Sequence, residues 1–215
     1  MPARIFVLAG VNGAGKSSVG GAALLQRNVE YFNPDLAARA LLEANPGMPP
    51  DTANGHAWEY GRKGLERALA EGLNFAFETT LGASTIPDML LAGAQGGAQV
   101  HIWYAGLSSP ELHMQRVRAR VAAGGHDIPE QKIRQRYVGS RANLIRLLRF
   151  AASVRVYDNS AEGDPKTGHR PRPLLLLHLE AGRIVSHIAL DQVPHWAKPI
   201  LVVALEHDGS KGARP

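Results

Sequence analysis

Short apolar runs alternate with longer amphipathic stretches over residues 1–160 of the chain. Each apolar run is closed by a polar residue, a glycine or a proline, and the runs lie at 5–9, 31–33, 74–78, 99–104 and 154–158. Runs of this length predict strands, and the most continuous of them predict strands that are buried on both faces of a sheet.

The stretches between these runs carry apolar residues at helical spacing. They predict helices at 18–26, 36–43, 51–72, 84–94, 110–123 and 130–150. Asp51 or Thr52 can cap the third of these helices, and Ser109 can cap the fifth with Pro110 in its first turn. Because strands and helices alternate, we expect a three-layer α/β fold with right-handed crossovers, a parallel sheet and helices on both faces.

The pattern changes in the C-terminal part of the chain. Residues 161–173 are polar with glycine and proline, which predicts a loop. Two apolar runs at 174–180 and 184–188 flank an Ala-Gly-Arg turn and predict a hairpin. The tail carries Trp196 and an apolar run at 200–205. We expect this tail to dock on the core and to fray after that run.

A chain of 215 residues fits one domain. We expect a core at 1–160, with a helical lid at about 116–149, and a C-terminal hairpin and tail at 161–215 packed on that core. There is no cysteine, which excludes disulfides and thiolate metal sites and favours the cytoplasm. No stretch reaches the length of a membrane span without a charge, so we expect no membrane partner.

A complete phosphate-loop motif, G-x-x-x-x-G-K-[ST], occupies residues 10–17 directly after the first predicted strand. Its glycines let backbone N–H groups turn toward a phosphate, which also meets the N-terminus of the next helix. A dinucleotide-binding turn is the alternative, but that turn lacks the Lys-Ser pair. The candidate residues for binding ATP are Gly10, Asn12, Gly13, Ala14, Gly15, Lys16, Ser17 and Ser18. Lys16 would reach the β- and γ-phosphates, and Ser17 would bind Mg²⁺.

Asp35 follows the second predicted strand and Pro34, at the strand end where open α/β sheets bind ligands. It is our candidate for the general base that accepts a proton from an alcohol. Arg39 lies one helical turn further on and would orient Asp35 or bind an anionic substrate. The alternative is that Asp35 only caps the helix at 36–43.

Glu78, Thr79 and Thr80 end the third predicted strand and are expected to face the same cleft. They would hold an acceptor sugar or bind Mg²⁺ through water. The two threonines also fit ordinary strand-end positions. Glu78 directly follows Phe75-Ala76-Phe77, where a carboxylate is costly to bury without a partner. We take Asn33, Asp35, Arg39, Glu78, Thr79 and Thr80 as candidate residues for binding the acceptor.

The formal charge of +5 is unevenly distributed, because residues 116–149 hold eight arginines and one lysine against two acidic residues. Such a block forms a solvated helical face, a nucleic-acid contact or an arginine-bearing lid over a triphosphate. Gly124-Gly125-His126-Asp127-Ile128-Pro129 divides the block and has the composition of a hinge. His126 in this hinge either contacts a ligand or is plain polar surface.

Four arginines on the two sides of the hinge are candidates for phosphate contacts. They are Arg116, Arg120, Arg134 and Arg136. Arg116 and Arg120 share one helical face by their i, i+4 spacing. We expect two or three arginines of the whole block to contact phosphate and the others to be solvated.

Taken together, seven motifs between about residues 4 and 160 resemble the zeta-toxin family of phosphate-loop kinases in order and spacing. They are residues 8–18, Phe32-Asn33-Pro34-Asp35, Phe77-Glu78-Thr79-Thr80-Leu81-Gly82, Arg116-Val117 with Arg120-Val121, Gly124-Gly125-His126 with Ile128-Pro129, residues 133–137, and Tyr157-Asp158-Asn159-Ser160. The Glu-Thr-Thr and Gly-Gly-His runs are typical of a compact branch of the family.

The resemblance implies a nucleotide-kinase-like fold that transfers the ATP γ-phosphate to a sugar hydroxyl, with UDP-N-acetylglucosamine as the acceptor in the well-known zeta toxins. It implies that Lys16 and Ser17 hold phosphate and Mg²⁺ and that Asp35 is the general base. Thr79 or Thr80 would contact substrate, and Arg120 and Arg136, or their neighbours Arg116 and Arg134, would be lid arginines. An antitoxin protein is the implied macromolecular partner.

Two hypotheses of different class follow. The first is a small-molecule kinase whose acceptor is a nucleotide sugar, NAD, a nucleoside or an antibiotic. The second is a nucleic-acid-binding ATPase in which nucleotide acts as a switch. The break at 124–129 and the scarcity of stacking aromatic residues, where only Tyr137 qualifies, speak against the second. No Asn-Lys-x-Asp run indicates a GTPase.

Overall fold

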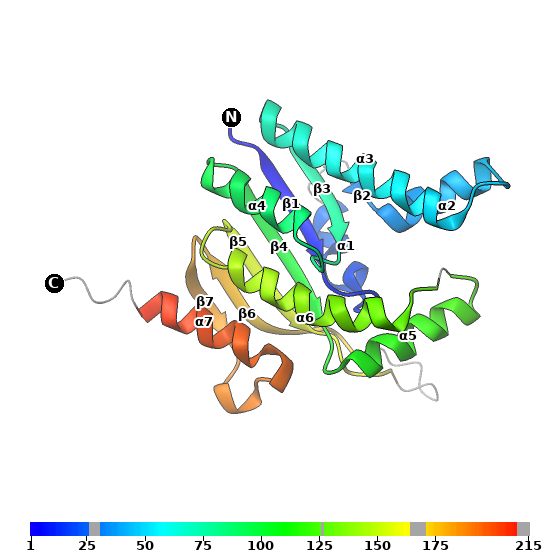
Figure 1. Cartoon of the computed structure of the whole chain (residues 1–215). Coiled ribbons are helices and arrows are strands. Elements are labelled where there is room, and N and C mark those ends of the chain that lie inside the picture. Colours follow the sequence, from blue (N-terminus) through cyan, green and yellow to red (C-terminus); the bar gives the residue numbers. More distant parts are fainter. Residues whose placement is uncertain (26–30, 126, 164–170, 210–215) are drawn as a thin grey trace.

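The computed structural model describes residues 1–25, 31–125, 127–163 and 171–209, which form one twisted sheet flanked by helices (Figure 1). The order of the seven strands is β2-β3-β1-β4-β5-β6-β7. The strands are β1 (Arg4–Ala9), β2 (Tyr31–Phe32), β3 (Asn74–Thr79), β4 (Gln99–Gly106), β5 (Ser153–Asp158), β6 (Leu174–Glu180) and β7 (Arg183–His187). The first five strands run parallel, as predicted.

The last two strands form the predicted C-terminal hairpin and run antiparallel. β6 pairs with β5 and β7 pairs with β6 in the same sheet. The hairpin is therefore not an appendage but extends the central sheet.

Helices cover both faces of the sheet, which confirms the predicted three-layer α/β class. They are α1 (Lys16–Leu25), α2 (Pro34–Ala44), α3 (Pro50–Glu71), α4 (Thr85–Gln95), α5 (Pro110–Ala122), α6 (Glu130–Leu147) and α7 (Lys198–Gly209), with short 3₁₀ turns η1 (Leu190–Gln192) and η2 (His195–Ala197). In Figure 1, α3, α4, α6 and α7 lie in front of the sheet and α1 lies behind it. None of the described helices is long and apolar enough to cross a membrane.

The ends of the helices differ in detail from the prediction. α3 begins at Pro50 with Pro49 in the cap position, so neither Asp51 nor Thr52 is its cap. Ser109 caps α5 as predicted, because its hydroxyl accepts a hydrogen bond from the backbone of Leu112. α6 ends at Leu147, short of the predicted residue 150. His126, residues 26–30, 164–170 and 210–215 lie outside the described residues, and so do the predictions made for them.

The carboxyl ends of the parallel strands meet at one edge of the sheet. Ala9 of β1 pairs with Thr79 of β3 on one side and with Tyr104 of β4 on the other. Gly106 of β4 pairs with Asp158 of β5. The phosphate loop, the Glu-Thr-Thr run and the segment after β5 therefore emerge side by side, and the sheet positions the candidate site here.

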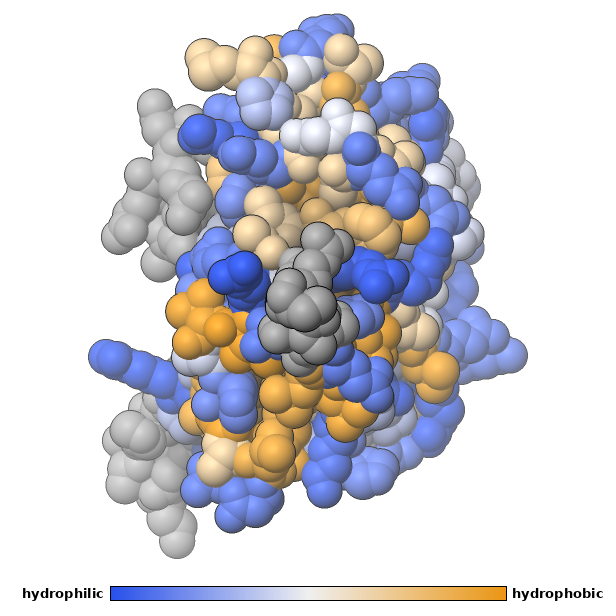
Figure 2. Space-filling view, turned by 90° about the vertical axis from the view of Figure 1, so that its left-hand side faces the viewer, coloured by the Kyte–Doolittle hydropathy of each residue, from blue (hydrophilic) through white to orange (hydrophobic). Residues whose placement is uncertain are grey.

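The C-terminal segment completes the core at the far side of the sheet. Trp196 of η2 is 2 % exposed and packs against Tyr104, and its indole Nε1 donates a hydrogen bond to Asp158 Oδ1 at 3.1 Å. Apolar side chains also gather on the outer face of this segment, which Figure 2 shows in its lower half. Among the described residues of the C-terminal segment, the large apolar side chains that are exposed are Leu174, Val185, Leu190 and Val202.

Candidate active site

The phosphate loop joins β1 to α1 in a conformation that requires glycine. Gly10, Gly13 and Gly15 have φ angles of 141°, 81° and 75°, which residues other than glycine rarely adopt. A Cβ on Gly10 would lie 2.3 Å from the Ala105 carbonyl oxygen, and one on Gly15 would lie 2.3 Å from Asn159 Nδ2. The loop is thus packed closely against the ends of β4 and β5.

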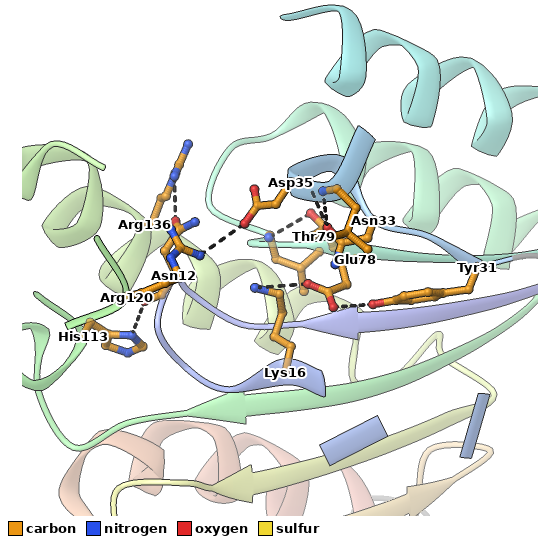
Figure 3. Close-up of polar contacts among 12 residues, drawn as sticks. Asn12, Lys16, Tyr31, Asn33, Asp35, Glu78, Thr79, His113, Arg120 and Arg136 are labelled. Atoms are coloured by element: carbon orange, nitrogen blue, oxygen red, sulfur yellow. Dashed lines mark hydrogen bonds and ion pairs between the residues drawn. The ribbon is translucent and has the colours of Figure 1, made fainter. Parts of the chain in front are cut away.

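Three side chains from outside the loop hold it in place (Figure 3 shows two of them). His113 Nδ1 lies 2.8 Å from the Asn12 carbonyl oxygen, and Asn159 Nδ2 donates to the Ala14 carbonyl oxygen at 2.8 Å. Arg136 of α6 donates from Nη1 to Asn12 Oδ1 at 2.7 Å. Two of these contacts hold the carbonyl oxygens of Asn12 and Ala14, and the third holds the Asn12 side chain, so the loop is fixed from three sides in the conformation that its glycines allow.

His113 is buried under the loop, with 1 % of its surface exposed. Burial lowers its pKa from the ordinary 6.5 to about 4, and the positive charges of Lys16, Arg116 and Arg141 lower the pKa further against the opposing effect of the Asn12 carbonyl. The imidazole is therefore neutral at pH 7. Because its partner is a carbonyl oxygen, Nδ1 carries the hydrogen.

Lys16 and Glu78 face each other at the mouth of the loop (Figure 3). Lys16 Nζ lies 3.7 Å from Glu78 Oε2, and both side chains are nearly buried. The other carboxylate oxygen, Oε1, accepts a hydrogen bond from the Tyr31 hydroxyl. The partner that Glu78 needs in its buried position is thus a cation from the phosphate loop together with a phenol from β2.

Asp35 lies in the first turn of α2, and its carboxylate pairs with Arg120 of α5 at 3.3 Å between Oδ2 and Nη1. The cap of α2 is Asn33, whose Oδ1 accepts hydrogen bonds from the backbone N–H groups of Asp35 and Leu36 at 2.9 and 3.2 Å. The interpretation of Asp35 as only a helix cap is therefore wrong. Its side chain points toward Arg120 of α5 (Figure 3).

Arg39, the expected partner of Asp35, lies elsewhere. It pairs with Glu43 at 2.8 Å on the solvent side of α2, where 76 % of its side chain is exposed. Asp35 and Glu43 each lie four residues from Arg39, so the i, i+4 rule allowed either partner, and its preference for an acidic residue before the basic one even favoured Asp35. The charge that orients Asp35 comes from Arg120, which is distant in sequence.

Thr79 and Thr80 shape the turn after β3. The Thr79 hydroxyl accepts from the backbone N–H of Leu81 at 3.1 Å, and the Thr80 hydroxyl accepts from that of Gly82 at 3.3 Å. Between these bonds Leu81 takes a φ angle of 51°, in the left-handed region. Each threonine hydroxyl still has a hydrogen to donate, and both residues follow Glu78 directly in the chain.

The arginines of the basic block divide into two groups. Arg120 and Arg136 reach residues of the site, Asp35 and Asn12. Burial lowers the pKa of Arg136, and the charge of Asp35 opposes this shift, so these two groups interact electrostatically. The other arginines contact groups outside the site. Arg118 pairs with Glu130, Arg134 pairs with Glu111, and Arg146 pairs with Asp88. Arg116 donates to the carbonyl oxygens of Ser160 and Ala161, Arg141 contacts the Tyr137 ring and the Trp196 carbonyl oxygen, and Arg149 lies over the Phe150 ring.

Ser17 and Ser18 open α1 directly after Lys16, and both are exposed at the loop. A hydroxyl at the first turn beside a glycine-rich cradle suits Mg²⁺ that is shared with nucleotide phosphates. Within the described residues no group of three or more His, Asp or Glu side chains is arranged to hold a metal ion. Magnesium in such a site takes most of its ligands from phosphate and water, so Ser17 is the side chain that fits it here.

Three residues that contact this site were absent from the set of candidates, namely Tyr31, His113 and Asn159. Asn159 follows β5 and belongs to one of the motifs that carried the family resemblance, so its position at the sheet edge could have been predicted from the sequence. Nothing in the sequence distinguished Tyr31 from other aromatic residues in strands, or His113 from other polar residues on helices. Their roles depend on contacts 47 and 101 residues apart in sequence.

A phosphate loop between the central strand of a parallel sheet and the following helix defines a P-loop protein with a kinase-like fold. The family model described as Zeta toxin matches residues 2–163, and the chain belongs to this family. An uncharacterized protein of Haemophilus influenzae is 28 % identical over 141 residues, which covers 64 % of this chain and 94 % of the relative.

Solved structures show the same fold. A chain of the native AvrRxo1-ORF1:-ORF2 complex matches with a TM-score of 0.60 and 14 % identity over 95 % of this chain, and the complex with ATP matches with 0.59 and 13 % over 94 %. This protein spans 64 % of the length of either matched chain. A structure of the PezAT chromosomal toxin-antitoxin system of Streptococcus pneumoniae matches with 0.55 and 14 %, over 100 % of this chain and 88 % of that chain.

Proposed function

We propose that this protein is an ATP-dependent small-molecule kinase that transfers the γ-phosphoryl group to a sugar hydroxyl, most readily that of a nucleotide sugar such as UDP-N-acetylglucosamine. The observation that carries the proposal is the position of Asp35. Its carboxylate is held by Arg120 at 3.3 Å and interacts electrostatically with Arg136, which in turn donates a hydrogen bond to Asn12 of the phosphate loop. A carboxylate there can accept the proton of an alcohol.

The donor half of the site is the loop itself. Its N–H groups and the N-terminus of α1 bind the phosphates of ATP, and Lys16 and Ser17 complete the contacts. Ser17 would help to hold Mg²⁺, which would neutralise phosphate charge. The guanidinium groups of Arg120 and Arg136 lie where they can stabilise charge on the γ-phosphoryl group as it transfers.

The acceptor half contains Asp35, Glu78, Thr79 and Thr80. In the transfer step the acceptor oxygen forms a bond to the γ-phosphorus, and the bond from phosphorus to the oxygen bridging the β-phosphate breaks. The acceptor proton passes to the Asp35 carboxylate, and ADP leaves with the bonding electrons. Threonine hydroxyls and carboxylates suit the ring hydroxyls of a sugar as hydrogen-bond partners.

Membership of the zeta toxin family supports the phosphotransferase activity, and the resemblance to that family supports a nucleotide sugar as acceptor. The structural neighbours include a protein of a toxin-antitoxin system, and on this ground we also propose a neutralising antitoxin as partner. The match to a structure with ATP supports ATP as the donor.

Purified full-length protein with ATP and Mg²⁺ tests the activity against a panel of acceptors. The panel contains UDP-N-acetylglucosamine, other nucleotide sugars, NAD, nucleosides and antibiotics, and the readouts are ADP release and the mass of the acceptor. We expect acceptor-dependent ADP release with a nucleotide sugar. Asp35→Asn should lower kcat about 10²- to 10⁴-fold, the usual contribution of a general base.

Glu43→Gln is the matched control, because Glu43 is an exposed carboxylate of the same helix and contacts Arg39 on the solvent side. This variant should turn over at the wild-type rate. A panel with no acceptor-dependent turnover contradicts the kinase proposal. ATP hydrolysis stimulated by nucleic acid, with an affinity that falls steeply with salt, would instead support the nucleic-acid-binding ATPase.

A further inference from the structure

Glu78 has a different partner on each of its two carboxylate oxygens. Oε1 accepts from the Tyr31 hydroxyl, and Oε2 faces Lys16 Nζ at 3.7 Å (Figure 3). The distance to Lys16 is that of an ion pair without a tight hydrogen bond, whereas the phenol is in direct hydrogen-bond contact. Tyr31 is therefore the group that fixes the direction of the carboxylate, and Lys16 is the partner that can leave.

The sheet register brings Tyr31 to Glu78. Tyr31 of β2 pairs with Ala76 of β3, so its long side chain runs beside β3 to a residue two positions further on. Its ring packs with the apolar cluster on the α1 face of the sheet, which includes Phe6 and Trp103. The ring is held by this packing, and only the hydroxyl reaches the polar site.

The Tyr31 hydroxyl is a permanent donor. Burial raises its pKa far above the usual value, and the hydrogen bond and negative charge of Glu78 raise the pKa further. The phenol therefore keeps its proton at neutral pH. Glu78 Oε1 therefore keeps its hydrogen bond from the Tyr31 hydroxyl, whether or not Lys16 is paired with Oε2.

We propose that Tyr31 is a positioning residue for nucleotide binding, which holds Glu78 so that Lys16 can exchange this carboxylate for the phosphates of ATP. The inference rests on the donor half of the proposed function, in which Lys16 binds phosphate, and not on any acceptor. When Lys16 turns to phosphate, Glu78 loses its cation in a nearly buried position. The phenol remains as its donor and limits the cost of that loss.

Loss of the phenol would affect this exchange of Glu78 for phosphate in two ways. Glu78 can then turn both oxygens toward Lys16 and hold it more tightly. A carboxylate that Lys16 leaves would also stand without its phenol donor. Both effects oppose nucleotide binding, so removing the hydroxyl should weaken the affinity for ATP, and removing the charge of Glu78 should strengthen it.

A double-mutant cycle on ATP binding tests the inference. Isothermal titration calorimetry in EDTA gives the Kd of ATP for the wild type, Tyr31→Phe, Glu78→Gln and the double variant, without any acceptor. We expect Tyr31→Phe to raise the Kd about tenfold, as for a lost hydrogen bond to a charged group. Glu78→Gln should bind ATP more tightly than the wild type, and Tyr31→Phe should add no further change in that background.

Tyr60→Phe is the matched control, because Tyr60 also packs against β2, at 5.4 Å from Phe32, but is 64 % exposed. Its Kd should equal that of the wild type. An equal loss of affinity from Tyr31→Phe in both backgrounds would overturn the proposal, because a packing defect does not depend on the charge of Glu78. Weaker binding by Glu78→Gln alone would overturn it as well, even if Tyr31→Phe did not fold. An acceptor panel without turnover would leave this result unaffected.

Discussion

His113 is the residue whose titration links the phosphate loop to the stability of the protein. Its pKa is about 4 in the folded chain and 6.5 in its ordinary state. Between these values the unfolded chain binds a proton that the folded chain does not. The stabilising contribution of the neutral imidazole is therefore complete above pH 6.5 and is lost as the pH falls toward 4, by about 3 kcal/mol in total.

His113→Asn removes the titrating group and keeps an amide donor that can bond the Asn12 carbonyl. We expect the variant to be less stable than the wild type at pH 7, since it fills less of the buried site. The difference in the free energy of unfolding should shrink as the pH falls from 6.5 to 4. Urea denaturation at several pH values measures it, and a difference independent of pH would contradict the assignment.

At the scale of residues, the sequence predicted where the acidic side chains of the candidate site lie better than it predicted which residues they contact. Asp35 follows β2 and Glu78 lies near the end of β3, so chain order and sheet geometry were enough to predict both at the carboxyl edge of the sheet. Their partners were not predictable, because Arg120 and Tyr31 reach them from 85 and 47 residues away in sequence. Local rules such as the i, i+4 spacing suggested Arg39, which contacts Glu43 instead.

At the scale of elements, α6 is firmly docked although it belongs to the predicted lid. Asn143 Nδ2 donates to the carbonyl oxygens of Leu81 and Ala83 at 2.7 and 3.1 Å. A Cβ on Gly139 would lie 2.7 Å from the Gly82 carbonyl oxygen, so the helix and the turn after β3 are nearly in backbone contact. This contact fixes Arg136, which lies one turn before Gly139.

Gly139→Ala should push α6 away from the turn after β3. We expect a loss of about 1–3 kcal/mol in the free energy of unfolding, as for overpacking in a core. If the proposed role of Arg136 holds, kcat should fall more than the affinity for ATP, because the helix that carries this arginine shifts. Thermal unfolding and steady-state kinetics measure the two effects.

Gly55→Ala is the control, because it makes the same change in α3, where a Cβ meets nothing within 4 Å. That variant should gain roughly 0.5–1 kcal/mol from its better helix propensity. Equal effects at the two glycines would contradict the docking of α6. The sequence predicted both arginine helices and the break between them, but it could not predict this docking, which depends on two backbones in contact.

At the scale of the whole molecule, the C-terminal segment is part of the sheet that carries the site. β6 covers the edge of β5, and Trp196 fills the space above Gly106, where a Cβ would lie 2.2 Å from the indole ring. Trp196 also bonds Asp158, the neighbour of the Asn159 that holds the phosphate loop. Hydrophobic periodicity predicted this hairpin, but it could not predict whether the hairpin adds to the β2 edge or to the β5 edge of the parallel strands.

A chain that ends at residue 163, the limit of the matched family model, should therefore not fold cooperatively. It exposes the edge of β5 and the apolar residues that pack under β6 and η2, including Val154 and Val156. A chain that ends at residue 209 serves as control. Circular dichroism during heating compares the two, and a sharp transition in the shorter chain would contradict the claim.

The central claim is that Asp35 acts as the base for phosphoryl transfer from ATP bound at the phosphate loop. Single-turnover reactions with UDP-N-acetylglucosamine and ATP, followed by mass spectrometry of the sugar nucleotide, test it most directly when the Kd of ATP is measured in parallel. We predict that the wild type forms phosphorylated product, while Asp35→Asn forms it at least about 100-fold more slowly with nearly unchanged ATP affinity. Transfer by Asp35→Asn at the wild-type rate would contradict the account.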